Sequence, residues 1–306
     1  MNDEAMLAQE RREFHEDLIR RKVVGFTAKK SKDVNISVAS NADVSQTASR
    51  EIASRMLHLV LRETNLTAMA PLSGQTLGKE FEKAVCRFVQ RTFPNLQTLR
   101  PGDWKVQQLG NQSAIKEASF SQYEHLSLID ELVNGNRDLK AALGNDYVVA
   151  PDVVVSRGLY TDEELNESTI LVNSKVARNA DLRVGNTPQG GPKLPILHAS
   201  ISAKWTMRSD RAQNSRTEAL NLIRNRKGQL PHVVVVTGEP LPSRIASLAL
   251  GTGDIDCTYH AFLYELIQAV DEMASQGRED LAELVHTLVD GKRLKDISDL
   301  PLDLAV

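Results

Sequence analysis

Apolar and polar residues follow each other along this chain with two periods, one typical of helices and one typical of strands. In residues 78–93, Phe81, Val85, Phe88 and Val89 lie three or four positions apart, a spacing that predicts a helix with one buried stripe. Patterns of the same kind predict further helices at residues 3–21, 47–63, 121–143 (one or two helices), 208–228, 242–251, 261–276 and 279–289. The segment 27–47 is polar and rich in turn residues, so we expect a long loop there, and we expect an irregular tail at residues 291–306.

Three apolar segments favour strands instead. Residues 146–157 are rich in β-branched side chains, 196–207 alternate apolar with polar positions, and 231–240 hold a continuous apolar run between proline and glycine. Strands separated by helices predict the fold class α/β, with a mixed central β-sheet flanked by helices. We expect a single domain, 1–306, with an N-terminal helical part of about 1–95 and an α/β core of about 96–306.

Composition narrows the class of protein. The 306 residues are 41% hydrophobic and 25% charged with a net charge of −3, so any nucleic-acid binding must depend on local basic patches. The two cysteines, Cys86 and Cys257, are far apart, which argues against a disulfide framework or a zinc site. There is no signal sequence and no apolar run near the ~20 residues that span a bilayer, so we expect a soluble protein of the cytoplasm.

The segment 196–207 presents a lysine on one face of a strand. Alternate side chains of a strand point to opposite faces, so the polar face carries Lys204 and the apolar face belongs to the core. The apolar face is Leu197, Ala199, Ile201, Ala203 and Trp205, and the other is His198, Ser200, Ser202 and Lys204. Burying a lysine is costly without a partner, so either this face is exposed or Lys204 has an anionic neighbour.

Asp152 and Glu218 are the candidates for that neighbour. Asp152 follows Pro151 within one predicted strand, and Glu218 lies on the helix after the lysine strand. Two carboxylates and a lysine suit Mg²⁺-dependent hydrolysis of a phosphodiester, because hard cations prefer carboxylate oxygens and a bound metal ion activates water. The same residues also allow a plain alternative, in which Asp152 is a turn residue, Glu218 is solvated and Lys204 reaches solvent from a sheet edge.

Arg208, Asp210 and Arg211 stand at the start of the helix that follows. Arginines there oppose the helix dipole, so a ligand explains them better than a capped helix with surface charge. In a DNA major groove, arginine can bind guanine O6 and N7 while aspartate accepts from cytosine N4, so this cluster can read adjacent C·G pairs. Two symmetric copies of the cluster would read a palindrome.

These residues lie in longer strings that resemble a family of type II restriction endonucleases, the branch of the PD-(D/E)xK nucleases that reads a CCGG core. The strings are RPGDW, SISAKWTMRSDRAQNSR, LNLIRNRKG, LPHVVVVT, PSRIAS, GTGDIDC and GKRLKDISDLPLDLAV, and the resemblance extends over nearly the whole chain. It implies a restriction-endonuclease-like core. The usual motif has an acid two residues before the lysine; here that residue is Ser202, and in this branch the second carboxylate is moved to the following helix, where Glu218 lies.

The resemblance assigns roles residue by residue. It implies an active site of Asp152, Lys204, Glu218, Glu82 and Ser202, and Mg²⁺ held by Asp152, Glu218 and the backbone carbonyl of Ala203. The local pattern around Glu82 alone would make it a solvated helix residue. For DNA, the resemblance implies that the inner CCGG is read by Arg208, Asp210 and Arg211. It implies that the outer G·C pair is read by Ser45, Ser243 and Arg244, and that Gln75 contacts the minor groove.

Because all the outer readers are present, the resemblance implies cleavage of GCCGGC after the first G, leaving four-base 5′ overhangs. It also implies a homotetramer of two back-to-back dimers, each on one DNA duplex, in a bacterial cytoplasm. The resemblance further implies a cognate methyltransferase as a functional partner that does not bind this protein. Two other functions stay open. One is a DNA-binding tetramer with a decayed active site, which the serine at position 202 in place of the usual acid suggests. The other is a structure-specific repair nuclease on the same fold.

Overall fold

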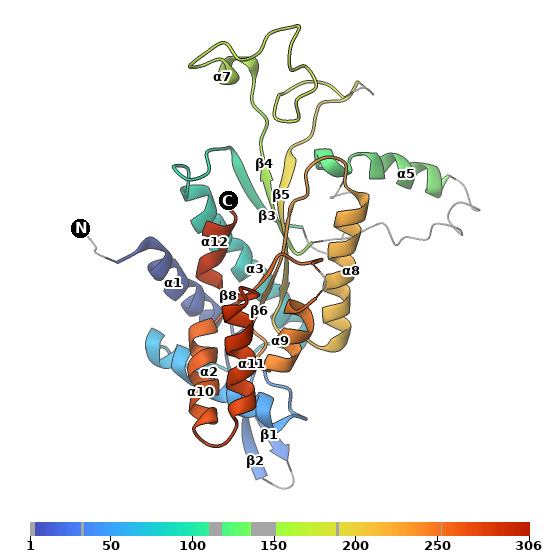
Figure 1. The fold of residues 1–306 in the computed structure, drawn as a ribbon. Helices are drawn as coiled ribbons and strands as arrows, with labels where there is room; N and C mark the ends of the chain where they lie inside the picture. The colour runs from blue at the N-terminus through green and yellow to red at the C-terminus, as the bar shows by residue number, and fades with distance from the viewer. Residues whose placement is uncertain (1–3, 32–33, 110–117, 136–150, 188–189, 252) are drawn as a thin grey trace.

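A six-stranded mixed sheet forms the centre of the molecule, with helices on both faces (Figure 1). The computed structural model describes residues 4–31, 34–109, 118–135, 151–187, 190–251 and 253–306. The helices are α1 (Met6–Arg20), α2 (Thr47–Thr64), α3 (Gly74–Thr92), α5 (His125–Asn134), α7 (Asp162–Leu165), α8 (Ser209–Asn225), α9 (Pro242–Ala249), α10 (Leu263–Ala274), α11 (Glu279–Asp290) and α12 (Leu300–Asp303), with 3-10 turns η1 (Phe93–Asn95), η2 (Ser121–Tyr123) and η3 (Ile297–Asp299). The strands are β1 (Phe26–Ser31), β2 (Val34–Ala39), β3 (Trp104–Gln108), β4 (Val153–Arg157), β5 (Ile196–Lys204), β6 (His232–Thr237), β7 (Cys257–His260) and β8 (Leu294–Asp296).

The strand order is β3-β4-β5-β6-β7-β8, which confirms the predicted mixed sheet. β4 pairs antiparallel with both of its neighbours, β3 and β5, and the strands from β5 to β8 run parallel. Parallel neighbours need crossover connections, and these contain α8, then α9, then α10 and α11. The carboxyl ends of β5, β6 and β7 therefore meet at one edge of the sheet.

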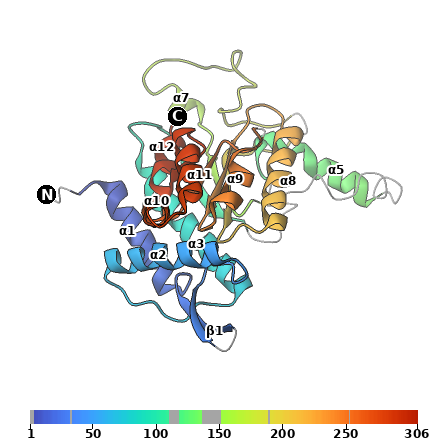
Figure 2. The ribbon, with the colours of Figure 1, turned by 60° about the horizontal axis from the view of Figure 1, so that its bottom comes forward.

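The predicted core stripe of α3 is confirmed, since Phe81, Val85, Phe88 and Val89 are all buried. They belong to the largest apolar cluster, which also holds residues of α1, α2, α10, α11 and the sheet. A second cluster on the opposite face joins Val154 of β4 to Ala219 and Leu222 of α8. Figure 2 shows α1, α2 and α3 together on one side of the molecule and α8 on another.

Several predictions about local structure were wrong. The segment 27–47, expected as a loop, contains the antiparallel hairpin of β1 and β2. The C-terminal residues, expected to be irregular, form β8, η3 and α12. Two further strands, β3 and β7, were not predicted. The helix α3 begins at Gly74 rather than near residue 78, and α8 ends at Asn225, before Gly228. The predicted strand at 146–150 and the helical residues 136–143 lie outside the described residues.

The faces of β5 follow the predicted alternation only from Ala199 onward. Ala199, Ile201 and Ala203 pack in the larger cluster, whereas Leu197 packs in the other one. The cause is a bulge: Val155 pairs with Ala199 and Ser156 with Leu197, so β5 has an extra residue, His198, at this point. His198 accordingly stacks on Phe93, and its Nε2 bonds the carbonyl of Leu304 at 2.7 Å, far from the face of Lys204.

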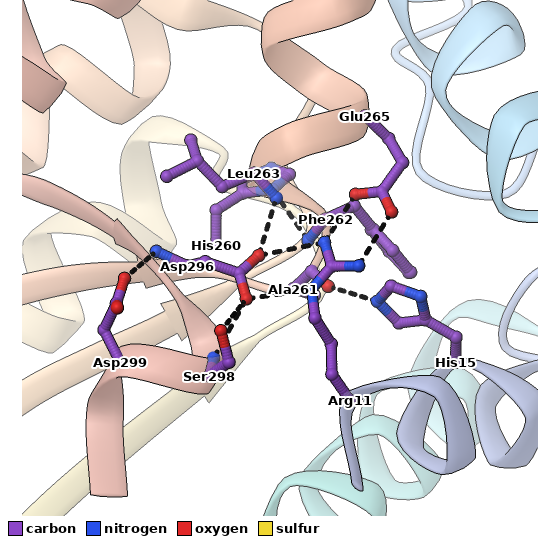
Figure 3. A network of polar contacts seen from close by, with 10 residues as sticks. All are labelled: Arg11, His15, His260, Ala261, Phe262, Leu263, Glu265, Asp296, Ser298 and Asp299. Carbon is purple, nitrogen blue, oxygen red and sulfur yellow. Dashed lines mark hydrogen bonds and ion pairs between the residues drawn. The ribbon is translucent and has the colours of Figure 1, made fainter. Parts of the chain in front are cut away.

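The N-terminal helix is joined to the C-terminal half of the chain by a buried charged network (Figure 3). Arg11 of α1 donates to both carboxylate oxygens of Glu265 on α10, at 2.9 and 2.7 Å, and to both oxygens of Asp296 on β8, at 2.9 and 3.0 Å. Asp296 also accepts the backbone N–H of Leu263 and of Ser298.

Among the residues that the structure describes, none of the helices combines the length and apolar character needed to cross a lipid bilayer.

Candidate functional site

Asp152 and Lys204 form an ion pair where β4 begins and β5 ends. The antiparallel register, in which Val153 faces Ile201, brings the residue before β4 beside the carboxyl end of β5. The Lys204 Nζ donates to Asp152 Oδ2 at 2.6 Å, and the same oxygen accepts the backbone N–H of Ala203 at 2.7 Å. The two side chains are only 17% and 15% exposed. Lys204 therefore has the anionic neighbour that its position on a central strand requires.

Glu218 approaches the same pair from α8. Ser202, on the face of β5 that carries Lys204, shares a hydrogen bond of 3.1 Å with Ser215, which lies one turn before Glu218. Burial raises the pKa of Glu218 to about 7; Asp152 and Glu82 add to the rise, and Lys204 and a hydrogen bond from Ser202 oppose it. The helix after the lysine strand thus places a carboxylate over the Asp152–Lys204 pair.

Glu82 completes the cluster from α3, on the other side of the strand ends. Its Oε2 accepts from Gln108 Nε2, at the end of β3, at 3.1 Å. Burial raises the pKa of Glu82, and the charge of Asp152 raises it further. The structure therefore brings together Asp152, Lys204, Glu218, Glu82 and Ser202, five residues from four elements or their ends.

The balance of charge in this cluster favours a divalent cation. Burial alone would lower the pKa of Lys204, but Asp152, Glu218 and Glu82 outweigh it and raise that pKa. Burial is the main cause of the raised pKa values of Glu218 and Glu82, and the charge of Asp152 adds to both. Carboxylate oxygens are the ligands that hard divalent cations prefer, so the residues present fit such an ion.

Arg208 occupies the N-cap of α8, four residues after Lys204, and its side chain is exposed. It lines a cavity of about 130 Å³ together with Arg244, Asp43, Gly74 and Trp205. The backbone of Asp210 and Arg211 lies in the first turn of α8, but their side chains are outside the described part of the chain. Gln75 is exposed in the first turn of α3, directly after Gly74.

Ser45 and Arg244 meet at a carboxylate that the sequence analysis missed, Asp43. Ser45 donates its N–H at 2.9 Å and its hydroxyl at 2.6 Å to Asp43 Oδ1, and Arg244 donates to Oδ2. The hydrogen bonds from Ser45 and then from Arg244 lower the pKa of Asp43 to about 2. Ser243 is exposed beside Arg244 at the start of α9. The residues predicted to read the outer base pair therefore gather at one place, although the loop of Ser45 and the helix α9 are far apart in sequence.

A second carboxylate missed by the sequence analysis is Glu239, in the turn between β6 and α9. It is fully buried, and burial raises its pKa to about 7. The only local signal was an acid two residues after a continuous apolar strand, in the string VVVVTGEP, which by itself is typical of a turn.

Comparison with known proteins gives the family of the chain. The family described as NgoMIV restriction enzyme matches residues 14–306. The chain is 49% identical over 301 residues to the type II restriction enzyme NgoMIV of Neisseria gonorrhoeae, covering 98% of this chain and 99% of that enzyme.

Two solved structures of Bse634I restriction endonuclease, one of them with cognate DNA, are more distantly similar. They are 14% and 15% identical with TM-scores of 0.35 and 0.26, covering 85% and 79% of this chain and 98% and 81% of theirs. The match to the family model and the relative at 49% identity each extend over nearly the whole chain, and the chain belongs to the NgoMIV family of type II restriction endonucleases.

Proposed function

We propose that this enzyme cuts both strands of DNA at GCCGGC, after the first G, in a reaction that depends on Mg²⁺. The observation that carries the proposal is the convergence of Asp152, Lys204 and Glu218 at the carboxyl end of β5, four residues before Arg208. A cutting site and a base-reading residue on one short segment suit sequence-specific cleavage better than binding alone.

In this proposal Asp152, Glu218 and the carbonyl of Ala203 would hold the metal ion. When bound, the ion activates a water molecule and offsets charge on the phosphate in the transition state. Lys204 is held in place by Asp152, so its ammonium group can orient the attacking water. The water oxygen forms a bond to phosphorus and the bond to the 3′ oxygen breaks, which leaves a 5′-phosphate and a 3′-hydroxyl. Glu82 and Ser202 border this site, Glu82 as a further carboxylate and Ser202 through its contact with α8.

The same proposal assigns the DNA contacts. Arg208, Asp210 and Arg211 read the inner CCGG, since arginine and aspartate match guanine and cytosine edges in the major groove. Ser45, Ser243 and Arg244 read the outer G·C pair, and their grouping around Asp43 supports a common target. Gln75 contacts the minor groove.

We further propose that the enzyme works as a homotetramer of two dimers. The long excursion between β4 and β5, described for residues 158–187 and 190–195, projects from the rest of the molecule (Figure 1). It carries four exposed large apolar side chains, Ile170, Leu171, Val176 and Val184. We assign a second copy of the chain as the partner that covers them. Sedimentation of the wild-type protein and of a variant with Ile170→Glu and Leu171→Glu tests this, since a tetramer should fall to a smaller species.

The main test is a digest of DNA of known sequence with the ends mapped to the base. Fragments that end at G/CCGGC with Mg²⁺, and intact DNA with EDTA, are the expected result. Specific binding with no cleavage would instead favour a decayed active site, and cleavage at branched or damaged DNA without this sequence would favour a repair nuclease. A plasmid with two sites should be cut faster than one with a single site if the tetramer acts on two duplexes.

A further inference from the structure

The turn after β6, residues Gly238–Leu241, lies where the segments carrying the proposed readers converge. Glu239 in this turn is fully buried. Its Oε2 accepts the backbone N–H of Met207, the residue before Arg208, at 2.7 Å. Its Oε1 accepts the backbone N–H of Leu241 at 3.1 Å and lies 3.8 Å from Nη1 of Arg244. One carboxylate therefore contacts both the segment of the inner reader and the segment of the outer reader.

The loop that carries Ser45 reaches the same turn. Asn41 donates from Nδ2 to the carbonyl of Gly238 at 2.7 Å, two residues before Asp43. A side chain at position 238 would come within 2.7 Å of the ring of Trp205, so only glycine allows this packing. From the other side, His260 at the end of β7 bonds the carbonyl of Glu239 at 3.0 Å. The turn is therefore held by the ends of β5 and β7 and by the loop after β2.

A carboxylate serves here in a way that a neutral side chain cannot. Both of its oxygens accept hydrogen bonds, so a single planar group can hold two backbone N–H groups at a fixed separation. A glutamine has only one acceptor oxygen, and its NH₂ group would face one of the two donors. Because a buried carboxylate is costly, a neutral residue would be the simpler choice if only packing were needed.

We propose that Glu239 is a positioning residue that fixes the separation of Arg208 and Arg244, and so couples the reading of the inner and outer base pairs. The inference rests on the proposed function, in which those two arginines contact bases. Loss of the carboxylate would release both segments together and weaken discrimination at both base positions, whereas a residue that serves stability alone would lower the melting temperature and leave the choice of sequence unchanged.

The chain offers a matched control in Asp296. It is also fully buried, and it also accepts two backbone N–H groups and lies beside an arginine, but its partners belong to α1, α10 and η3 rather than to a reader segment (Figure 3). Glu239→Gln and Asp296→Asn each replace a buried carboxylate by its amide, and they differ in what the carboxylate holds. Asp296 also accepts two hydrogen bonds from Arg11, so Asp296→Asn is the larger perturbation of the fold.

The experiment measures binding in Ca²⁺ to three duplexes, containing GCCGGC, ACCGGT or GACGTC. We expect Glu239→Gln to lose about tenfold in discrimination against both altered duplexes, a fraction of what good base contacts supply, and Asp296→Asn to stay within about twofold of wild type. Equal effects of the two variants, or a Glu239→Gln enzyme with wild-type ratios, would overturn the inference. Arg208→Ala is measured beside them: if it leaves the preference unchanged, the assignment of the readers fails, which is a separate result.

If Glu239→Gln does not fold, Asn41→Ala keeps the inference testable. It detaches the loop of Ser45 from Gly238 and leaves the bonds of Glu239 to Met207 and Leu241 in place. Discrimination against ACCGGT should then fall while that against GACGTC is kept. Equal loss at both duplexes would contradict the inference, because it would show that Glu239 does not hold the segment of Arg208 once the loop of Ser45 is detached. No loss at either duplex would show that the contact of this loop with the turn does not position the outer readers.

Discussion

The Lys204 ammonium group donates to Asp152 Oδ2 at 2.6 Å, although 52 positions separate the two residues in the chain. The pairing depends on the antiparallel register of β4 and β5, which sets Asp152 beside the end of the lysine strand. Since the same oxygen also accepts the N–H of Ala203, the position of Lys204 is fixed before any substrate binds. The proposed site is therefore preorganised by the sheet.

Replacing Lys204 should separate cutting from binding. Lys204→Ala removes the charge that orients the attacking water, and we expect cleavage to fall by at least about 100-fold, the lower range for removal of a positioned charged group. Binding to a GCCGGC duplex in Ca²⁺ should change by less than about tenfold. Both are measured on the same oligonucleotide, by gel for cleavage and by fluorescence anisotropy for binding.

Lys295→Met is the matched control, because Lys295 also pairs with a carboxylate, Asp303, at 2.6 Å, but on β8. It should cut at the wild-type rate. Normal cleavage by Lys204→Ala would show that the site has been assigned to the wrong residues.

The carboxyl group of Glu218 should make the metal-free protein less stable as the pH rises. Its folded-state pKa of about 7 lies above the ordinary value of 4.5, so the folded protein keeps a proton that the unfolded chain releases. The stability from this group is fully present below about pH 4.5 and is lost as the pH rises through 7. Glu218→Gln removes this dependence, and its stability relative to wild type should rise by about 2–3 kcal/mol between pH 5 and 8.

Denaturant unfolding in EDTA at both pH values measures this change. Glu283→Gln, an exposed position on α11, should show no such change between the two pH values. If the difference between Glu218→Gln and wild type is the same at pH 5 and pH 8, Glu218 is not the group that is held protonated.

Arg208 should determine sequence preference rather than general affinity. Arg208→Ala is expected to lose roughly 1–3 kcal/mol of discrimination at one base position of the inner CCGG. The measurement compares binding in Ca²⁺ to duplexes altered at each base pair in turn. Arg226→Ala is the control: Arg226 is exposed at the other end of α8, and its loss should weaken binding to all duplexes alike or not at all. A uniform loss for Arg208→Ala would make it a phosphate contact instead.

Two adjacent arginines of α1 should differ greatly in their effect on stability. Arg11→Met leaves the buried carboxylates of Glu265 and Asp296 without their cation, and breaking a buried ion pair in this way costs about 3–5 kcal/mol. Arg12→Met removes only an exposed pair with Glu4 and should change the melting temperature much less. Thermal unfolding of the two variants tests this, and similar effects would mean that the network in Figure 3 contributes little.

The pH dependence of the Arg11 network has the opposite sign to that of Glu218. Burial would raise the pKa of Glu265, but the hydrogen bonds from Arg11 outweigh it and bring that pKa to about 2. Its stabilisation is present above the ordinary value of 4.5 and is lost as the pH falls toward 2. In Arg11→Met the loss of stability in acid should therefore be smaller than in wild type between pH 5 and 3.

Local patterns predicted what depends on neighbours in sequence. The stripe of α3 and the apolar face of β5 from Ala199 to Trp205 are buried as expected, because periodicity reports burial directly. The pattern failed at Leu197 and His198, where the bulge reverses the two faces, and a bulge is a property of the pairing with β4 rather than of β5 alone.

Other features could not be read from the sequence because their partners are distant. Asp296 is buried at the end of β8, where it accepts hydrogen bonds from Arg11, 285 positions away, and from the backbone of Leu263 and Ser298. The hairpin of β1 and β2 lies in a segment that is polar and rich in turn residues over most of its length, so the short alternation of Val34, Ile36 and Val38 was overlooked. Glu82 looked solvated by its own helix pattern, and only the family resemblance placed it near Asp152. Asp43 and Glu239 had no such pointer, since their role lies in the backbone groups and arginines that they hold.

The short stretch between Lys204 and Arg208 has a practical consequence for engineering. In the proposed enzyme, Lys204 acts at the bond that is broken and Arg208 at the base that is recognised. The short backbone stretch between these two residues sets the distance from base to bond, with no hinge or linker between them. Redesigning the base preference by replacing reader side chains should therefore preserve the stagger of the cut. Changing the length of the overhang would require a new path for the backbone itself.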